Sequence, residues 1–174
     1  MRSTKKITLS ASIVALGTVL MVLGGLFDVL DLSACALASL LVAFVYIEIG
    51  SPYTYLVWLS TSLLAFVFFS ASPLWMEYLL VFGIYPILKA YIERLPRAVW
   101  LLPKLGFINL VLLILYFAFE LVFGTPLFTV TGLWIKVALW VGLNIVFILY
   151  DIFLTVLIRF YIERLRPRFK HLLK

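Results

Sequence analysis

Six apolar runs follow one another along the chain, and each is long enough to cross a bilayer as a helix. Spanning the hydrocarbon takes about 17–25 apolar residues, and such runs cover residues 7–27, 33–49, 53–70, 74–92, 99–123 and 133–158. Turn-forming residues separate them, for example Gly50-Ser51-Pro52 and Gly124-Thr125-Pro126. Because the chain is 66% hydrophobic and only 13% charged, its polar residues are too few to cover a soluble domain. We therefore predict an all-α integral membrane protein, with residues 1–174 forming one domain of six transmembrane helices.

The basic residues predict how these helices are oriented. With the N-terminus in the cytoplasm, thirteen of the fourteen lysine and arginine residues fall on the cytoplasmic side: Arg2, Lys5, Lys6, Lys89, Arg94, Arg97, Lys104, Arg159, Arg164, Arg166, Arg168, Lys170 and Lys174. Only Lys136 falls outside, so the positive-inside rule places both termini in the cytoplasm, at what we expect to be a bacterial cytoplasmic membrane. The net charge of +6 then indicates contacts with anionic lipid headgroups rather than with nucleic acid.

A short segment occurs twice at the cytoplasmic ends of two predicted helices. Lys89-Ala-Tyr-Ile-Glu-Arg-Leu95 resembles Arg159-Phe-Tyr-Ile-Glu-Arg-Leu165. Each copy offers an interfacial tyrosine and a basic residue four positions before a glutamate, which predicts an ion pair along the helix. The two copies are either the trace of a parallel repeat or a solution that recurs at membrane interfaces. Within the first of these helices, Pro86 predicts a bend.

The sequence lacks the residues of common catalytic and metal sites. It contains no Gly-x4-Gly-Lys-Ser/Thr phosphate loop and no His-Glu-x-x-His motif, and it has one histidine, His171, and one cysteine, Cys35. We therefore expect no enzymatic activity, no cofactor and no metal. Cys35 ends a match to a lipoprotein cleavage box, but the run at 7–27 exceeds the apolar core of a signal peptide, so we expect it to be retained.

Polar residues inside the apolar runs are costly in lipid and mark candidate sites. Helical spacing aligns Lys136, Trp140 and Asn144 in the last run, and Asn109, Tyr116 and Glu120 in the run before it. With Glu77 they predict a pocket open to the outer side, where a few polar groups among aromatic rings are typical of a small-molecule site. Alternatively, Asn109 and Asn144 join two helices by hydrogen bonds, while Glu77, Glu120 and Lys136 reach the headgroups.

Two further carboxylates are interpreted as ion-pair partners rather than as site residues. Asp151 lies toward the cytoplasmic half of the last run, and Glu48 lies at the inner end of the second run. We expect Asp151 to pair with a basic residue rather than to relay protons. We expect Glu48 to pair with a lysine or arginine at the interface.

Small residues recur at helical spacing in the first run. Thr8, Ala11, Ala15, Thr18 and Gly25 share one predicted face. In lipid, helices associate through close backbone contact over such residues, because the hydrophobic effect contributes little there. The sequence alone leaves open whether the helix that packs on this face belongs to the same chain or to a partner.

Six short helices with both ends inside and an Ala-x-x-x-Ala strip at Ala11 and Ala15 resemble the substrate-binding S components of energy-coupling factor (ECF) transporters. The resemblance implies a subunit that captures a vitamin or related micronutrient from the outer side, under a loop that would here contain Asp28 and Asp31. It also implies that Ala11 and Ala15 dock on a transmembrane coupling subunit driven by an ATPase pair. The segment from Lys5 to Ala11 also resembles small membrane proteins of Gram-positive anaerobes. The alternative is a non-transporting helical protein that assembles or regulates a membrane complex, with a lipid enzyme as a third interpretation.

Overall fold

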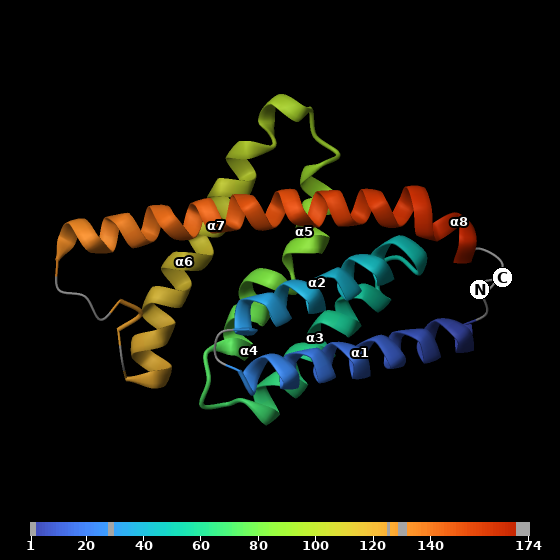
Figure 1. The fold of residues 1–174 in the computed structure, drawn as a ribbon, viewed down its shortest axis with the longest axis horizontal. Helices are drawn as coiled ribbons and strands as arrows, with labels where there is room; N and C mark the ends of the chain where they lie inside the picture. Colours follow the sequence, from blue (N-terminus) through green and yellow to red (C-terminus); the bar gives the residue numbers. More distant parts are fainter. Residues whose placement is uncertain (1–2, 28–29, 125, 129–131, 170–174) are drawn as a thin grey trace. The chain divides into compact units, whose positions relative to one another are not determined.

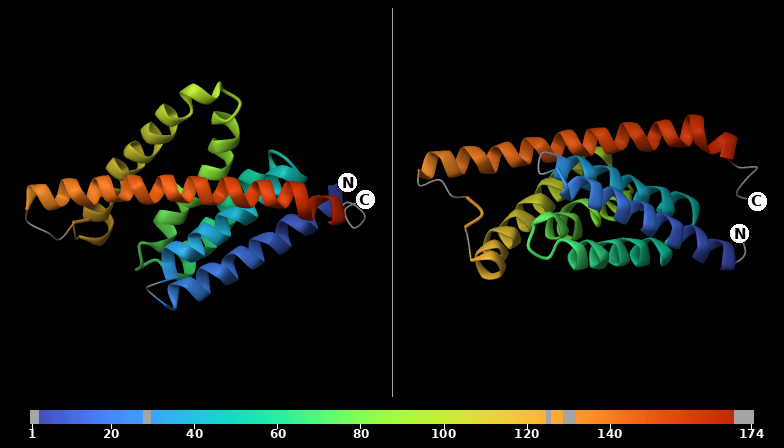
Figure 2. Two further views of the ribbon diagram at one scale, coloured as in Figure 1. Left: turned by 45° about the horizontal axis from the view of Figure 1, so that its top comes forward. Right: turned by 60° about the horizontal axis from the view of Figure 1, so that its bottom comes forward.

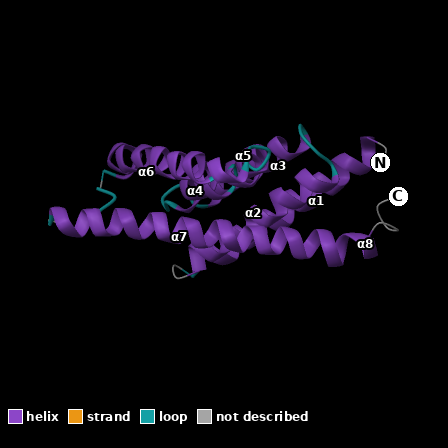
Figure 3. Cartoon of the chain, turned by 90° about the horizontal axis from the view of Figure 1, so that it is seen from above, coloured by secondary structure: helices purple, strands orange, loops and turns teal. Residues whose placement is uncertain are grey.

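The computed structural model describes residues 3–27, 30–124, 126–128 and 132–169. Every regular element in these ranges is a helix, and no strand is drawn among them in Figure 3. Four segments are long and apolar enough to cross a membrane: Ser3–Gly25, Asp31–Glu48, Arg97–Phe123 and Leu133–Leu165. The prediction of an all-α fold is therefore confirmed for the described residues, four segments of which have the length and composition to cross a membrane.

Most helix bounds lie close to those predicted from the apolar runs (Figure 1). The observed helices are α1 (Ser3–Gly25), α2 (Asp31–Glu48), α3 (Tyr53–Phe68), α6 (Leu101–Phe123) and α7 (Leu133–Phe160). Helix α3 is apolar but shorter than the four long segments. Beyond α7 the chain continues as a π-helical turn, η4 (Tyr161–Leu165), and a short helix, α8 (Arg166–Phe169).

The run at 74–92 is not one helix bent at Pro86, as the sequence analysis expected. It consists of α4 (Leu74–Glu77), the π-helix η2 (Tyr78–Phe82) and α5 (Tyr85–Ile92). The interruption lies at Gly83 and Ile84, before the proline. Pro86 occupies the first turn of α5, where a missing backbone N–H costs little because that N–H has no partner within the helix.

A tryptophan on α3 stabilises this interruption. The amide of Gly83 donates to the carbonyl of Tyr78 at 2.7 Å, five residues back, so it does not serve the carbonyl of Leu79 as it would in an α-helix. The indole of Trp58 donates to that Leu79 carbonyl at 3.1 Å. A side chain at Gly83 would overlap the Trp58 ring, so the close approach requires glycine at this position.

The described chain forms two compact units. The first comprises residues 1–88 and 153–174, and the second comprises residues 89–152. In the first unit α1, α2 and α3 pack on one another, and they stay side by side in both views of Figure 2. Helices α4 and η2 pack against α2 and α3. The sequence-based prediction of a single six-helix domain stays a prediction.

Helix α1 contacts its neighbours through small residues that the sequence analysis did not select. Ser10, Gly17 and Gly24 are buried and recur every seven residues, which places them on one face. A Cβ atom at Gly17 would lie 3.3 Å from Thr61 on α3, and one at Gly24 would overlap Ala34 on α2.

The face predicted for α1 is only partly covered by the packing within the first unit. Thr8, Ala11 and Ala15 are exposed, whereas Thr18 is buried. Helical spacing still places these residues within one arc of α1, and the Thr18 end of that arc borders the strip that packs on the other helices. The strip that packs within the chain is rotated from the predicted strip by about a quarter of a turn or more, which leaves most of the predicted strip exposed.

The first unit also confirms the expected partner of Glu48. Its carboxylate accepts a hydrogen bond from the Tyr161 hydroxyl at 3.0 Å and lies 2.9 Å from Nε of Arg166. The Tyr161 ring meets Phe44 edge-on, with 5.3 Å between the ring centroids. These contacts hold η4 and the start of α8 against the end of α2.

The close contact of Gly24 with α2 gives a prediction for stability. We expect Gly24→Ala to lower the free energy of unfolding by about 1–3 kcal/mol, because the added methyl group has no room against Ala34. Gly106→Ala is the matched control, since a Cβ there meets no atom within 4 Å and alanine favours a helix. Thermal unfolding in detergent, followed by circular dichroism, measures both. Equal melting temperatures for the two variants would contradict the observed packing of α1 on α2.

Candidate functional site

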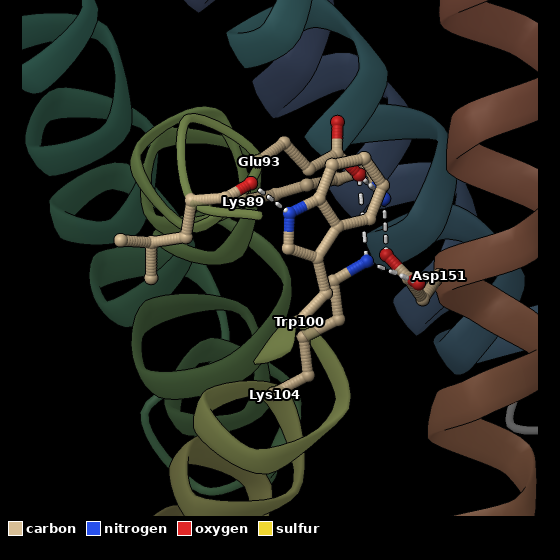
Figure 4. Close-up of polar contacts among 6 residues, drawn as sticks. Lys89, Glu93, Trp100, Lys104 and Asp151 are labelled. Carbon is tan, nitrogen blue, oxygen red and sulfur yellow. Dashed lines mark hydrogen bonds and ion pairs between the residues drawn. The ribbon is translucent and has the colours of Figure 1, made fainter. Parts of the chain in front are cut away.

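Four charged side chains form a closed ring in the second unit (Figure 4). Lys89 lies on α5, Glu93 in the turn that follows it, Lys104 on α6 and Asp151 on α7. Asp151 contacts Lys89 through one carboxylate oxygen and Lys104, at 2.7 Å, through the other. Glu93 contacts the same lysines through one oxygen, at 2.6 Å to Lys89 and 3.4 Å to Lys104. Positive and negative groups thus alternate around this ring, which we call the charge ring.

The charge ring is largely enclosed by the protein. The exposed fraction of the side chain is 2% for Lys89, 10% for Lys104, 16% for Asp151 and 29% for Glu93. Two ammonium groups and two carboxylates balance to zero charge, which lowers the cost of placing them among apolar helices. The ring fixes three helices of this unit to one another, because removing any member leaves an uncompensated charge.

The ring confirms two sequence-based expectations and adds residues that the sequence did not reveal. Asp151 pairs with basic residues, and Lys89 pairs with Glu93 four positions later, as expected. Lys104 was assigned only to the cytoplasmic basic group, since no spacing rule connects it with a carboxylate 47 positions away. The one available signal was its place at the start of an apolar run, where an unpaired ammonium is costly.

Trp100 closes the turn beside the ring. Its indole N–H donates to the Leu95 carbonyl at 2.7 Å, and its ring centroid lies 5.5 Å from Nζ of Lys104. The cation–π contact favours the charged lysine. The hydrogen bond fixes the backbone between α5 and η3 (Arg97–Val99).

The two asparagines and the tryptophan of the predicted pocket meet in the second unit. Nδ2 of Asn109 donates to Oδ1 of Asn144 at 3.0 Å and to the Leu105 carbonyl at 2.8 Å. The Trp140 indole donates to Oδ1 of Asn109 at 2.8 Å, and Nδ2 of Asn144 donates to the Trp140 carbonyl at 3.0 Å. Helices α6 and α7 are thereby joined by hydrogen bonds, which is the alternative interpretation given for the asparagines.

The remaining predicted residues of α6 and α7 differ in how far they are buried. Tyr116 is partly buried and its ring lies 5.5 Å from that of Phe117, edge-on. Glu120 is exposed, and Lys136, in the first turn of α7, is partly buried. The ring of Phe128, in the segment between these helices, lies 6.5 Å from that of Trp140.

Two of the acidic residues predicted near the outer face, Asp31 and Glu77, belong to the first unit. Asp31, at the start of α2, interacts electrostatically with Glu77 at the end of α4. Cys35 is buried between them and α1, with its sulfur 3.9 Å from both the Met21 sulfur and the Leu74 carbonyl. The indole nitrogen of Trp75, on α4, is buried without a hydrogen-bond partner among the described residues. Asp28 lies outside the described residues.

These arrangements define what the two units can do chemically. The charge ring and the asparagine pair are internally satisfied and act as helix-to-helix connections. In the described ranges no three side chains of histidine, cysteine, aspartate or glutamate are placed to hold a metal ion. In the first unit, Glu77 and the indole N–H of Trp75, which has no hydrogen-bond partner among the described residues, are candidate groups for recognition.

Comparison of the chain with protein-family models, with curated proteins and with solved structures found no match. The class of protein is therefore defined by the structure alone. The part of the chain that the structure describes is all-helical and has four helices long and apolar enough to span a membrane, and a balanced charge ring links α5, α6 and α7.

The charge ring gives a second prediction. We expect Asp151→Asn to destabilise the protein by about 3–5 kcal/mol, because two enclosed ammonium groups then lose their shared carboxylate. Glu120→Gln is the control, since it removes one negative charge from an exposed position of the same unit. Thermal unfolding in detergent compares the two variants with the original protein. A drop of similar size in both would show that net charge, not the ring, sets the effect.

Proposed function

We propose that this chain is the substrate-capture subunit of an ECF-type importer, docked on a transmembrane coupling subunit through the exposed face of α1. The observation that supports the proposal is the distribution of small residues on that helix. Ser10, Gly17 and Gly24 serve the packing of α1 within the first unit. Ala11 and Ala15 are exposed on another side, so the chain carries two small-residue strips and uses only one of them internally.

The exposed strip has the surface that helix association in lipid requires. The Thr8 hydroxyl donates to the Thr4 carbonyl at 3.0 Å, and the Ser12 hydroxyl donates to the Thr8 carbonyl at 3.1 Å. Both hydroxyls are thus bonded to their own helix, and the side chains of Ala11 and Ala15 are small and exposed. A helix of the coupling subunit can approach its backbone closely there.

The proposal includes six spans with both termini in the cytoplasm of a bacterial membrane. It rests on the thirteen basic residues assigned to one side and on the short helices that complete the run from 53 to 92. Because the sequence contains no phosphate-binding loop, ATP hydrolysis would come from the ATPase pair bound to the coupling subunit.

The small molecule would enter from the outer side. In the second unit, the candidate contacts are the polar groups of α6 and α7, which are Asn109, Tyr116, Glu120, Lys136, Trp140 and Asn144. In the first unit, Glu77 and Asp31 are separate candidates, and Asp28 lies outside the described residues. The indole N–H of Trp75, which has no acceptor among the described residues, supports a ligand with an acceptor oxygen or nitrogen beside α4, since a buried donor without an acceptor is costly.

The docking strip is tested with a pair of double variants. We expect Ala11→Leu with Ala15→Leu to leave the thermal stability of the protein nearly unchanged, because these side chains are exposed. The coupling subunit should no longer co-purify with this variant. Gly17→Leu with Gly24→Leu is the matched contrast, because it fills the internal strip. We expect it to lower the free energy of unfolding of the isolated protein by ~1–3 kcal/mol per site or more. Destabilisation by the alanine substitutions, or an undiminished yield of the partner, would refute docking at α1.

A second function, assembly or regulation of a membrane complex without transport, is supported by the bonded asparagines. Asn109, Asn144 and Trp140 satisfy one another, as expected of a structural contact between helices. In that case α1 would still dock a partner, but the chain would bind no transported ligand.

Native mass spectrometry of the gently purified protein separates the two functions. We expect a small molecule to remain bound to the original protein, and Asn144→Leu to weaken its binding by about 1–3 kcal/mol through a lost hydrogen bond. The exposed position Ile145→Leu is the control on the same helix. A protein that purifies with its partner but with no small molecule would favour the assembly function.

A further inference from the structure

Two charged side chains of opposite sign lie at the ends of α6 and α7 that are joined by the loop between these helices. Glu120 belongs to the last turn of α6, and Lys136 belongs to the first turn of α7. Neither side chain forms an ion pair or a hydrogen bond with a residue that the structure describes. An unpaired charge on a membrane-spanning helix is costly and therefore marks a candidate binding site.

The hydrogen bond between two asparagines fixes where these charges lie along the helices. Nδ2 of Asn109 on α6 is 3.0 Å from Oδ1 of Asn144 on α7. From this contact toward the loop, Glu120 is eleven residues away and Lys136 is eight residues away, which correspond to about 16 and 12 Å along the helices. Both charges therefore lie on the loop side of the asparagine contact, and their depths differ by about one helical turn.

The helices also direct both charges toward the side on which they meet. Steps of four residues place Lys136 on the face of α7 that carries Asn144. Steps of seven and four residues place Glu120 on the face of α6 that carries Asn109. The helices cross near the asparagines and diverge toward the loop (Figure 1). This divergence explains why two opposite charges on facing sides do not pair with each other.

Two aromatic rings pack on each other one helical turn from Lys136. The ring centroid of Trp140 lies 6.5 Å from that of Phe128, with an angle of 66° between the ring planes. The Trp140 indole donates to Oδ1 of Asn109 at 2.8 Å, which fixes the ring and makes it a rigid apolar surface. Because the asparagines are bonded to each other, Glu120 and Lys136 are the groups here that remain for a charged ligand.

We propose that Glu120 and Lys136 bind the two charges of a zwitterionic amino acid, whose apolar side chain packs on the rings of Trp140 and Phe128. The Glu120 carboxylate accepts hydrogen bonds from the ammonium group of the ligand, and the Lys136 ammonium donates to the ligand carboxylate. A ligand with a single charge would leave one of these two side chains unpaired. The inference rests on the proposed function, because it names the chemical class of the captured substrate.

The test titrates the full-length protein in detergent with L-phenylalanine, with phenethylamine, which lacks the carboxylate, and with 3-phenylpropanoate, which lacks the ammonium group. We expect L-phenylalanine to bind most tightly. Glu120→Gln should weaken L-phenylalanine binding about ten-fold or more, as for a lost charge-assisted hydrogen bond, and leave 3-phenylpropanoate binding unchanged. Lys136→Gln should weaken L-phenylalanine binding by a similar factor and leave phenethylamine binding unchanged. Isothermal titration calorimetry measures each affinity.

Variants in the first unit control for the change in total charge. Glu163→Gln and Lys6→Gln remove the same two kinds of charge from that unit, and we expect neither to change binding. Thermal unfolding without ligand verifies that each variant is folded. Absent L-phenylalanine binding, equal affinity for the three probes, or equal losses in Glu163→Gln and Glu120→Gln would each overturn the inference.

A phospholipid headgroup is another source of a zwitterion. Phosphatidylethanolamine carries an ammonium group that donates hydrogen bonds, whereas phosphatidylcholine carries a quaternary one that has no N–H to donate. We expect the two lipids to compete equally weakly with L-phenylalanine. Stronger displacement by phosphatidylethanolamine would overturn the inference, because it would assign the two charges to a lipid.

The inference and the proposed function fail in different ways. A bound small molecule that carries a single charge, found by native mass spectrometry in a protein that still co-purifies with its coupling subunit, would overturn the inference and leave the proposed function intact. Charge-dependent L-phenylalanine binding by a protein that captures no coupling subunit would support the zwitterion site and contradict the importer function.

Discussion

Asp151 holds two lysine ammonium groups at once, and the second unit depends on this carboxylate. Lys89 comes from α5 and Lys104 from α6, so one side chain of α7 connects it to both. Glu93 completes the arrangement from the turn between them. Enclosed charges of this kind add little stability compared with apolar packing, but losing one of them is costly. Their main effect is to specify how the helices are aligned, because apolar side chains alone permit helices in lipid to slide or rotate.

The sequence predicted the helices well because lipid imposes their length. The bounds of α2, α3, α6 and α7 follow from the apolar runs and from the turns between them. The faces of the helices were less predictable. Every side of α1 is apolar or small, so its spacing pattern does not distinguish the side occupied by Gly17 from the side occupied by Ala11. Only the positions of Thr61 and Ala34, on other helices, determine which side is covered.

Contacts distant in the sequence explain most of what the sequence analysis missed. The π-helix η2 depends on Trp58, which bonds the Leu79 carbonyl from 21 residues away. Lys104 joins a carboxylate on α7 that no local rule connects with it. By contrast, Asn109, Trp140 and Asn144 were selected correctly as a group, because polar residues in an apolar run must meet a partner. Their role is what the pattern left open, since a binding site and a helix-to-helix contact use the same residue types.

The two copies of the segment Tyr-Ile-Glu-Arg-Leu have the same five residues but make different contacts. In the first copy the chain leaves helix α5 at Ile92, and Glu93 enters the charge ring. In the second copy the same residues form η4, where Glu163 is exposed and the Tyr161 hydroxyl bonds Glu48. A proline follows the first copy directly, as Pro96, and follows the second copy after one further residue, as Pro167. This difference in position contributes to the different structures, because a proline disfavours helix in the residue before it. The glutamate is therefore the residue that the fold requires in the first copy, and the tyrosine is the one that it requires in the second. The two segments are alike in sequence but tolerate substitution at different positions.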